Sequence, residues 1–331
     1  MPQLEDIIAA LSDPAIYPDP APAVALEQTQ MSVVFLAGDY VYKVKKPVNL
    51  GYLDYTTLEQ RLEFCRKEVD LNRRLCPHAY LGVVAITIKD GRLSLGGSGK
   101  VVEYAVKMRR LPGERMMDVL LGEGRVSVEM VRRLAATLAD FHARAAVVSG
   151  FGDITTIRTN TEENFQQVRD YVGRTLPPAR YDRIASYTRR FIQHEAARLQ
   201  QRVAEGRVRD CHGDLHTAHV CFTDPVCIFD CIEFNDRFRY VDVAGEVAFL
   251  SMDIDRLGRS DLADAFVKAY IEHSGDTGLA GLLNFYKCYF AFVRGKVAGF
   301  KLDDPLVPED ERAEALALAQ RYFELAEAYT R

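Results

Sequence analysis

The early part of the chain contains short runs in which apolar and polar residues alternate with the period of two typical of half-buried strands. Two such runs between residues 31 and 46 flank Ala37-Gly38-Asp39, a turn sequence that joins neighbouring antiparallel strands. Further strand-like runs at 81–89 and 100–108 are separated by a Gly-rich turn. The pattern therefore predicts a small antiparallel sheet.

A helical period interrupts these strands. The residues Thr56-Thr57-Leu58-Glu59 have the form of a capping box, and apolar residues then recur at helical spacing until Pro77. These apolar residues are Leu58, Leu62, Cys65, Val69 and Leu75. Because Glu68 falls beside this stripe, we expect its carboxylate to face the sheet where Lys43 would lie.

Beyond a hinge-like sequence at 109–113, the pattern is helical. One buried stripe consists of Met130, Leu134, Leu138, Phe141 and Ala145. Further helices are expected at about 180–204, 260–273, 279–300 and 308–330. Ahead of the sheet, residues 3–11 predict a short helix that a proline-containing strap follows. We therefore expect an α+β fold, with residues 1–108 as a small lobe and residues 109–331 as a large, mostly helical lobe.

Length and composition agree with this division. A chain of 331 residues exceeds the usual size of a single core. The net charge of −5 and the lack of an arginine-rich arm argue against nucleic acid as a partner. The acidic N-terminus with its short apolar stretch predicts no signal peptide and no membrane span, so we expect a cytoplasmic protein. Seven cysteines without a C-x-x-C pattern favour reduced thiols.

Two aspartates carry the candidate chemistry. His212-Gly213-Asp214-Leu215-His216 offers an aspartate on a histidine-containing loop, and Asp230 follows the apolar run 226–229. In kinase-type sites one carboxylate accepts a proton from the attacking hydroxyl, while another holds Mg²⁺ against the nucleotide phosphates. The pair therefore favours phosphoryl transfer.

The order of the motifs adds a resemblance. The chain resembles the aminoglycoside phosphotransferase-like branch of the protein-kinase-like superfamily, over most of its length from about Thr29 onward. It is similar in particular to a bacterial group whose members are often fused to a P-loop ATPase domain. The motifs that carry this resemblance are Tyr42–Pro47, Glu68–Leu75, Met108–Arg110, His212–Leu215 and Phe229–Asn235.

The resemblance implies a two-lobed protein-kinase-like fold that transfers the γ-phosphoryl group of ATP to a hydroxyl of a small-molecule substrate. It implies Asp214 as the general base, with His212 holding its loop, and Asp230 as a Mg²⁺ ligand. Nucleotide contacts are expected from Lys43 paired with Glu68, from Ser32 over the phosphates, and from the hinge backbone near Lys107 and Met108. This chain shows no P-loop motif, so the P-loop ATPase domain implied by the resemblance is either missing or supplied in trans.

His219 departs from the pattern of the related kinases, which usually carry Asn five residues after the catalytic Asp. An imidazole is a softer ligand than an amide oxygen and suits Mn²⁺ better than Mg²⁺. Three interpretations stay open. His219 ligates the metal, or one metal binds more weakly, or activity is reduced.

The choice of lysine is also open from pattern alone. Alternation along the strand places Lys43 and Lys45 on one face, and only the resemblance selects Lys43. A solvent-reaching strand lysine is the plain alternative for either residue.

Four residues are candidate substrate contacts. The resemblance implies that the segment containing Glu233 and Asn235 shapes the floor of the site. Lys287 and Arg294, with Lys301, recur every seven residues, which suggests either a solvated helix face or a site for an anionic group of the substrate.

Two other classes of protein compete with the kinase. A nucleotide-binding regulator with little turnover would explain His219 and the lack of glycines in the expected phosphate loop around Ser32. A structural zinc module would explain the histidines and cysteines crowded between residues 211 and 231. Of these, only His212 with His216 has the usual ligand spacing, so buried core cysteines are the default interpretation.

Overall fold

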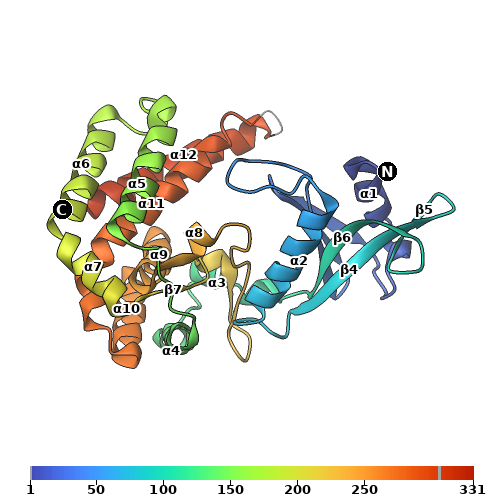
Figure 1. The fold of residues 1–331 in the computed structure, drawn as a ribbon, viewed down its shortest axis with the longest axis horizontal. Coiled ribbons are helices and arrows are strands. Elements are labelled where there is room, and N and C mark those ends of the chain that lie inside the picture. Colours follow the sequence, from blue (N-terminus) through green and yellow to red (C-terminus); the bar gives the residue numbers. More distant parts are fainter. Residues whose placement is uncertain (1, 305–306) are drawn as a thin grey trace. The chain divides into compact units, whose positions relative to one another are not determined.

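The computed structural model describes residues 2–304 and 307–331. The chain divides into two compact units (Figure 1). The first unit comprises the chain up to Met116 together with His219–Asp236, and the second comprises Met117–Ala218 and Arg237–Arg331. The division differs from the boundary at 108 expected from the sequence, because a segment that lies late in the chain returns to the first unit.

An antiparallel sheet of the order β1-β2-β3-β6-β4-β5 forms the centre of the first unit. Its strands are β1 (Val24–Gln28), β2 (Ser32–Ala37), β3 (Tyr40–Lys45), β4 (Tyr80–Lys89), β5 (Arg92–Leu95) and β6 (Lys100–Arg109). The sequence predicted the four inner strands of this sheet but neither edge strand, β1 after the prolines of the strap and β5 in the turn between β4 and β6. Gly38 in the β2–β3 turn has φ +59°, and a Cβ there would lie 2.6 Å from the carbonyl oxygen of Pro20, so the turn requires glycine.

The two faces of this sheet differ. One face packs against α1 (Leu4–Leu11) in a buried apolar cluster that includes Tyr42 and Val44 of β3. The alternate residues of β3, Lys43 and Lys45, make ion pairs with the helix α2 (Leu58–Asn72), which packs against β4 and β6 (Figure 1). The period of two along one strand thus separates an apolar core from a charged layer.

The capping box of α2 starts one residue later than predicted. The Thr57 hydroxyl accepts a hydrogen bond from the Gln60 N–H at 3.2 Å, and the Gln60 side chain accepts one from the Thr57 N–H at 3.0 Å. The buried face of the helix consists of Arg61, Cys65, Glu68, Val69 and Asn72. This i, i+4, i+7 spacing is the helical period that the sequence showed.

A short hairpin, β8 (Val220–Cys221) with β9 (Cys227–Ile228), belongs to the first unit although it lies late in the chain. Cys227 forms a disulfide with Cys76 at the end of α2, and their Cα atoms lie 4.7 Å apart. The expectation of reduced thiols is therefore wrong at this pair, because the fold joins residues 151 positions apart that no sequence spacing connects. The other five cysteines of the described residues, at positions 65, 211, 221, 231 and 288, are buried thiols.

The second unit is mostly helical (Figure 1). Its helices are α3 (Met117–Gly122), α4 (Val128–Arg144), α5 (Ile154–Val168), α6 (Pro178–His194), α7 (Ala196–Ala204), α9 (Val243–Arg256), α10 (Ser260–Ser274), α11 (Leu283–Phe300) and α12 (Glu309–Ala328). The short helix α8 (Asp236–Arg239) begins at the last residue of the first unit, and β7 (Val208–Asp210) pairs with β10 (Tyr240–Asp242). The single helix expected at 180–204 is broken between α6 and α7, and α5 was not predicted.

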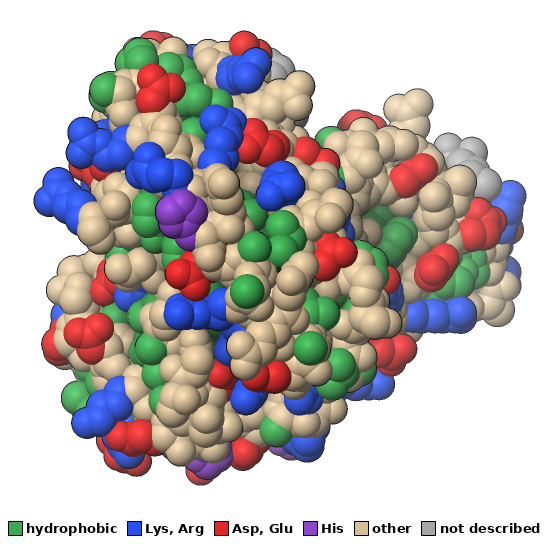
Figure 2. Space-filling model, turned by 60° about the vertical axis from the view of Figure 1, so that its left-hand side comes forward, with side chains coloured by type: hydrophobic (Ala, Val, Ile, Leu, Met, Phe, Trp, Pro, Cys, Tyr) green, Lys and Arg blue, Asp and Glu red, His purple; other side chains and the backbone are tan. Residues whose placement is uncertain are grey.

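Helix α9 lies at the centre of this unit, with Val243–Ile254 buried throughout and α10 and α11 packed against it. The face that Figure 2 shows carries charges of both signs. Some exposed charges of the second unit are paired, as Arg189 is with Glu162 at 2.7 Å. None of the helices among residues 2–304 and 307–331 has the length and apolar character to cross a membrane.

Candidate active site

An ion-paired cluster in the first unit contains three of the predicted site residues. The Lys43 ammonium lies 2.9 Å from Glu68 Oε1 and donates to Asp230 Oδ1 at 2.6 Å. Lys43 comes from β3, Glu68 from α2 and Asp230 from the loop after β9. The structure thus brings together the lysine, the glutamate and the metal aspartate that the sequence proposed.

The neighbouring lysine belongs to the same cluster. Lys45 donates to Glu68 Oε2 at 2.6 Å and also forms a short hydrogen bond with Glu233 Oε1. The Tyr55 hydroxyl donates to the same Glu233 oxygen at 2.6 Å. Lys45 is 1% exposed, whereas the Lys43 side chain retains 16% of its exposure. Of the two lysines, Lys43 is therefore the one with surface left to meet a ligand.

The opposite charges of this cluster keep one another ionised despite their burial. Burial opposes ionisation of Glu68, but Lys43 and Lys45 outweigh it and hold the pKa of Glu68 below its ordinary value. Burial likewise opposes the charge on Lys43, but Asp230 and Glu68 raise its pKa well above the usual range. The lysines and Glu68 are therefore charged at neutral pH.

Asp230 occupies an unusual backbone conformation, with φ +63°. Its N–H donates to the Tyr80 hydroxyl at 3.2 Å, and the next N–H, of Cys231, donates to Asn72 Oδ1 at 2.8 Å. A left-handed conformation at a residue other than glycine persists where the surroundings hold it, and such residues gather at functional sites. Here side chains of α2 and β4 hold the backbone at Asp230 and Cys231.

His219 comes next to Asp230 across the β8–β9 hairpin. Its Nε2 lies 3.6 Å from Asp230 Oδ2, and the two side chains are 14% and 40% exposed. The backbone holds the hairpin here, because the N–H of Phe229 donates to the His219 carbonyl at 3.0 Å. One imidazole nitrogen and one carboxylate oxygen at this separation fit a shared divalent cation of the Mg²⁺ to Mn²⁺ type.

The other predicted nucleotide contacts lie differently from expectation. Ser32 is 3% exposed, so its hydroxyl is not available to cover phosphates, and Lys107 donates to Asp19 at 2.8 Å. Met108 pairs with Val41 on one side and Tyr80 on the other. The backbone of a central strand is used by its two neighbours, so a free hinge backbone begins only after β6.

An apolar surface beside these strands was not predicted. Met108, Leu111, Met116 and Phe229 are partly buried and pack against the cluster between α2 and the sheet. Leu111 and Met116 lie in the segment after β6, and Phe229 precedes Asp230. Partly exposed apolar side chains beside a charged cluster fit a ligand with one flat apolar part and one anionic part.

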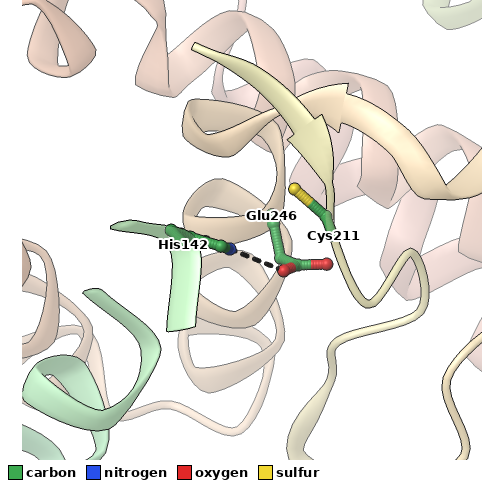
Figure 3. A group of neighbouring side chains, drawn as sticks. All are labelled: His142, Cys211 and Glu246. Carbon is green, nitrogen blue, oxygen red and sulfur yellow. Dashed lines mark hydrogen bonds and ion pairs between the residues drawn. The ribbon is translucent and has the colours of Figure 1, made fainter. Parts of the chain in front are cut away.

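The second unit holds the segment with Asp214, and α9 fixes its start. Glu246 Oε1 accepts hydrogen bonds from the N–H groups of His212 and Gly213, each at 2.7 Å. The other oxygen of Glu246 lies 2.7 Å from His142 Nε2 (Figure 3), and His142 Nδ1 lies 2.7 Å from the Tyr270 hydroxyl. Burial opposes ionisation of Glu246, but the His142 contact and the backbone N–H of Gly213 lower its pKa.

The end of the same segment is fixed by Asp253, two helical turns further along α9. Asp253 Oδ2 accepts from the Thr217 N–H at 3.0 Å and from the Thr217 hydroxyl at 2.6 Å. Between these two anchors, the Asp214 side chain is 33% exposed, and its N–H lies 3.3 Å from His212 Nδ1. Two buried carboxylates of one helix thus hold a loop whose aspartate remains accessible.

The candidate substrate contacts separate into two groups. Glu233 is 4% exposed in the cluster with Lys45, and Lys287 is 4% exposed and donates to Asp255 at 2.8 Å. Burial and ion pairing oppose a substrate role for both, and also the solvated-face interpretation of Lys287. Asn235 donates to the Tyr52 carbonyl at 3.1 Å. Arg294 is influenced by Asp214: burial opposes its charge, but Asp214 raises its pKa.

Two of the cysteines considered as zinc ligands have other neighbours. Cys227 is bonded to Cys76, and Cys211 lies beside His142 and Glu246, which contact each other (Figure 3). The structure therefore does not favour the zinc module over the phosphotransferase.

The comparisons with known proteins agree with this geometry. The chain belongs to the phosphotransferase enzyme family, whose model matches residues 38–282. Uncharacterised proteins of Mycobacterium bovis and Mycobacterium tuberculosis are each 33% identical over 280 residues, which are 83% of this chain and 55% of the relative. The chain therefore spans about half the length of these relatives.

Solved structures share the fold at low identity. A choline/ethanolamine kinase family protein from Mesorhizobium loti has a TM-score of 0.54 at 14% identity, covering 99% of this chain and 98% of its own. Choline kinase from Cryptosporidium parvum has a TM-score of 0.53 at 11% identity, covering 93% and 86%. The aminoglycoside phosphotransferase-like resemblance and the kinase-like α+β fold expected from the sequence are confirmed.

Proposed function

We propose that the protein transfers the γ-phosphoryl group of ATP to a hydroxyl group of a small molecule. The observation that carries the proposal is the cluster of Lys43, Glu68 and Asp230, an ammonium held between a helix glutamate and a loop aspartate. Kinase folds use such a lysine and glutamate pair to hold the nucleotide phosphates. A structure of similar fold, amicoumacin kinase, is a complex with AMP-PNP and Ca²⁺ (TM-score 0.53, 11% identity, covering 91% of this chain and 88% of its own), which supports nucleotide use.

In this proposal the first unit binds the nucleotide. Lys43 contacts the phosphates, and Asp230 and His219 hold a divalent cation, Mg²⁺ or Mn²⁺, whose chemistry is to neutralise phosphate charge. Met108, Leu111 and Phe229 offer an apolar surface for the base. The expected hinge moves from the backbone of Lys107 and Met108 to the segment after β6. Ser32, the buried first residue of β2, makes no direct contact with the nucleotide in this proposal.

The second unit supplies the proton acceptor. Asp214 accepts the proton of the substrate hydroxyl, and its loop is held by the contacts of His212, Gly213 and Thr217 with α9. We retain Asn235 and Arg294 as proposed substrate contacts, because both side chains are partly exposed. We drop Glu233 and Lys287, whose charges are neutralised inside the fold.

The test is a screen of ATP consumption against hydroxyl-bearing metabolites, with Mg²⁺ and Mn²⁺ in parallel and with Asp214→Asn as the matched variant. Choline, ethanolamine and aminoglycosides belong in the library. We expect turnover by the wild type with at least one acceptor, and a fall in kcat of roughly 10² or more in the variant. ATP affinity should be equal in both, since Asn keeps the size of Asp.

Two failures would be distinguishable. If the wild type binds no ATP with either cation, the proposal is wrong altogether. If it binds ATP but never transfers phosphate, the regulator becomes the better proposal, and His219 in place of Asn is the observation that favours it. A cytoplasmic location and a P-loop ATPase partner remain predictions from the sequence.

A further inference from the structure

The second lysine of β3 has no role in the proposed reaction so far. Lys45 is buried at 1% exposure, and its ammonium contacts Glu68 Oε2, Glu233 Oε1 and, at 3.5 Å, the Tyr55 hydroxyl. Glu68 and Glu233 are 0% and 4% exposed. A buried cation between two buried carboxylates is costly to form, because all three groups lose hydration. Its position next to the proposed nucleotide lysine suggests a use.

The charges form a continuous row of alternating sign. Asp230 contacts Lys43, Lys43 contacts Glu68 Oε1, Glu68 Oε2 contacts Lys45, and Lys45 contacts Glu233. The two lysines lie two residues apart on one strand and therefore share a face. Glu68 sits between them with one oxygen for each. Asp230 and Glu233 belong to one loop, so the row begins and ends on the same segment.

The Lys43 ammonium cannot keep all of its present contacts while it binds a nucleotide phosphate. Its ammonium is hydrogen-bonded to Asp230 in this structure, and a phosphate would compete with that carboxylate for it. When Lys43 turns to a ligand, Glu68 needs a second fixed cation to stay charged and oriented in a buried place. Lys45 is 1% exposed, so its ammonium cannot turn to the ligand and stays beside Glu68.

We propose that Lys45 is a positioning residue of the nucleotide site: with Glu233 it holds Glu68, and through Glu68 it orients Lys43 toward the phosphates. The inference rests on the proposed function, since it assigns Lys43 to the nucleotide. Tyr55 supports the arrangement from the loop before α2, with its hydroxyl on Glu233 and its ring 4.9 Å from the Lys45 ammonium.

The test removes the pair without leaving an unpaired buried charge. Lys45→Met combined with Glu233→Gln takes out one cation and one anion, keeps both side chains near their original size, and leaves the Tyr55 hydroxyl an amide oxygen to bond. The matched control is Lys67→Met combined with Asp236→Asn, an ion pair at 2.8 Å between α2 and the segment after Glu233, whose side chains are 32% and 42% exposed. Both double variants keep the net charge.

ATP affinity of the folded proteins is measured by calorimetry with Mg²⁺ and Mn²⁺, alongside the melting temperature. We expect the Lys45/Glu233 variant to bind ATP about tenfold more weakly, the effect of losing much of one charge-assisted contact. The control should bind as the wild type does. A purely structural role would lower the melting temperature and leave the affinity of the folded protein unchanged.

Repeating both measurements in a Lys43→Met/Glu68→Gln background, which leaves no unpaired carboxylate at position 68, decides whether Lys45 acts through Glu68 and Lys43. If it does, the Lys45/Glu233 change adds no further loss of affinity there. The inference is overturned if the losses of ATP affinity add, or if the Lys45/Glu233 variant alone binds ATP as tightly as the wild type does. Should the double variant not fold, Tyr55→Phe gives a milder form of the test in the same cycle. A wild type that binds no ATP refutes the proposed function and is a separate outcome.

Discussion

At the scale of single residues, the two lysines of β3 show how exposure separates roles that sequence position does not. Both contact Glu68, at 2.9 and 2.6 Å. The Lys43 side chain is partly exposed and also contacts the partly exposed Asp230, whereas Lys45 is buried. An ammonium that must meet an incoming phosphate needs an open side, so direct nucleotide contact belongs to Lys43.

Replacing Lys43 by Met should weaken ATP binding by about tenfold or more, because a charge-assisted hydrogen bond of roughly 1.5–3 kcal/mol is lost. Titration of ATP into the folded variant measures this directly. Lys89→Met, at an exposed lysine at the end of β4, is the control and should leave affinity unchanged. Equal affinity of wild type and Lys43→Met would remove Lys43 from the nucleotide site.

His219 and Asp230 lead to a second prediction at this scale, in the choice of metal. If His219 Nε2 ligates the cation beside Asp230, Mn²⁺ should support turnover at lower concentration than Mg²⁺, since nitrogen ligands follow the transition-metal order of affinity. His219→Asn restores an oxygen ligand and should shift the preference toward Mg²⁺. Parallel Mn²⁺ and Mg²⁺ titrations of activity measure the ratio.

The matched control is His78→Asn, the same substitution at an exposed histidine of the first unit. It should not change the Mn²⁺ to Mg²⁺ ratio. A ratio equally unchanged in His219→Asn would mean that His219 braces the hairpin and binds no metal.

The strand pattern could not choose which of the two lysines contacts the nucleotide, and the reason is physical. Alternation along a strand reports which face a residue lies on, and Lys43 and Lys45 lie on the same one. What distinguishes them is Glu233, a partner 188 residues away, and such contacts leave no local period. The same holds for the Cys76–Cys227 disulfide. By contrast, Asp214 and Asp230 stand inside local motifs, so the sequence alone could propose them as site residues.

At the scale of elements, helix α9 organises the second unit. Its carboxylates at 246 and 253 lie seven residues apart, therefore on one side of the helix, and bind both ends of the segment 212–217. The helix was not predicted, because a helix buried on every side lacks the apolar stripe that reveals an amphipathic one. Amphipathic α2 was predicted to within a residue at its start.

Glu246→Gln should lower kcat by about ten- to a hundredfold, since a small displacement of the Asp214 loop costs reactivity. ATP affinity should stay the same, because the proposed nucleotide contacts belong to the first unit. Kinetics and calorimetry on one preparation give both values. The control is Asp264→Asn at an exposed acid of α10, which should change neither. A loss of ATP affinity equal to the loss of kcat would contradict the assignment.

The same variant has a pH signature. The pKa of Glu246 in the folded protein lies below its ordinary value of 4.5, through its contacts with His142 and backbone N–H groups. Such a group stabilises the fold fully above the unfolded pKa, and this contribution disappears as the pH falls through the folded pKa. The difference in unfolding free energy between wild type and Glu246→Gln should therefore be constant near neutral pH and shrink below about pH 4.5. A difference that grows on acidification would contradict this sign.

At the scale of the whole molecule, each compact unit combines segments that are far apart in sequence. The segment 219–236 belongs with the sheet because its contacts are there: Asp230 with Lys43, Cys231 with Asn72, and Cys227 with Cys76. A boundary drawn by composition divides a chain once and cannot return a later segment to an earlier unit. This is why the expected boundary at 108 missed the hairpin that carries both proposed metal ligands.

This organisation predicts which segments nucleotide binding should protect from hydrogen exchange. A ligand at about a hundred times its Kd stabilises the state that binds it by about 2.7 kcal/mol, and the protection reaches first those amides that exchange by local opening near the site. With AMP-PNP and Mn²⁺, hydrogen exchange should slow in three separate segments, 40–45, 58–72 and 219–236, because one charged cluster joins them. The locally exchanging amides of α10, in the second unit, serve as the internal control and should not slow. At the same ligand concentration, Lys43→Met should reduce protection in all three segments together, since each depends on the same bound phosphates. Protection of 58–72 without 219–236 would show that α2 and the Asp230 loop do not respond as one site.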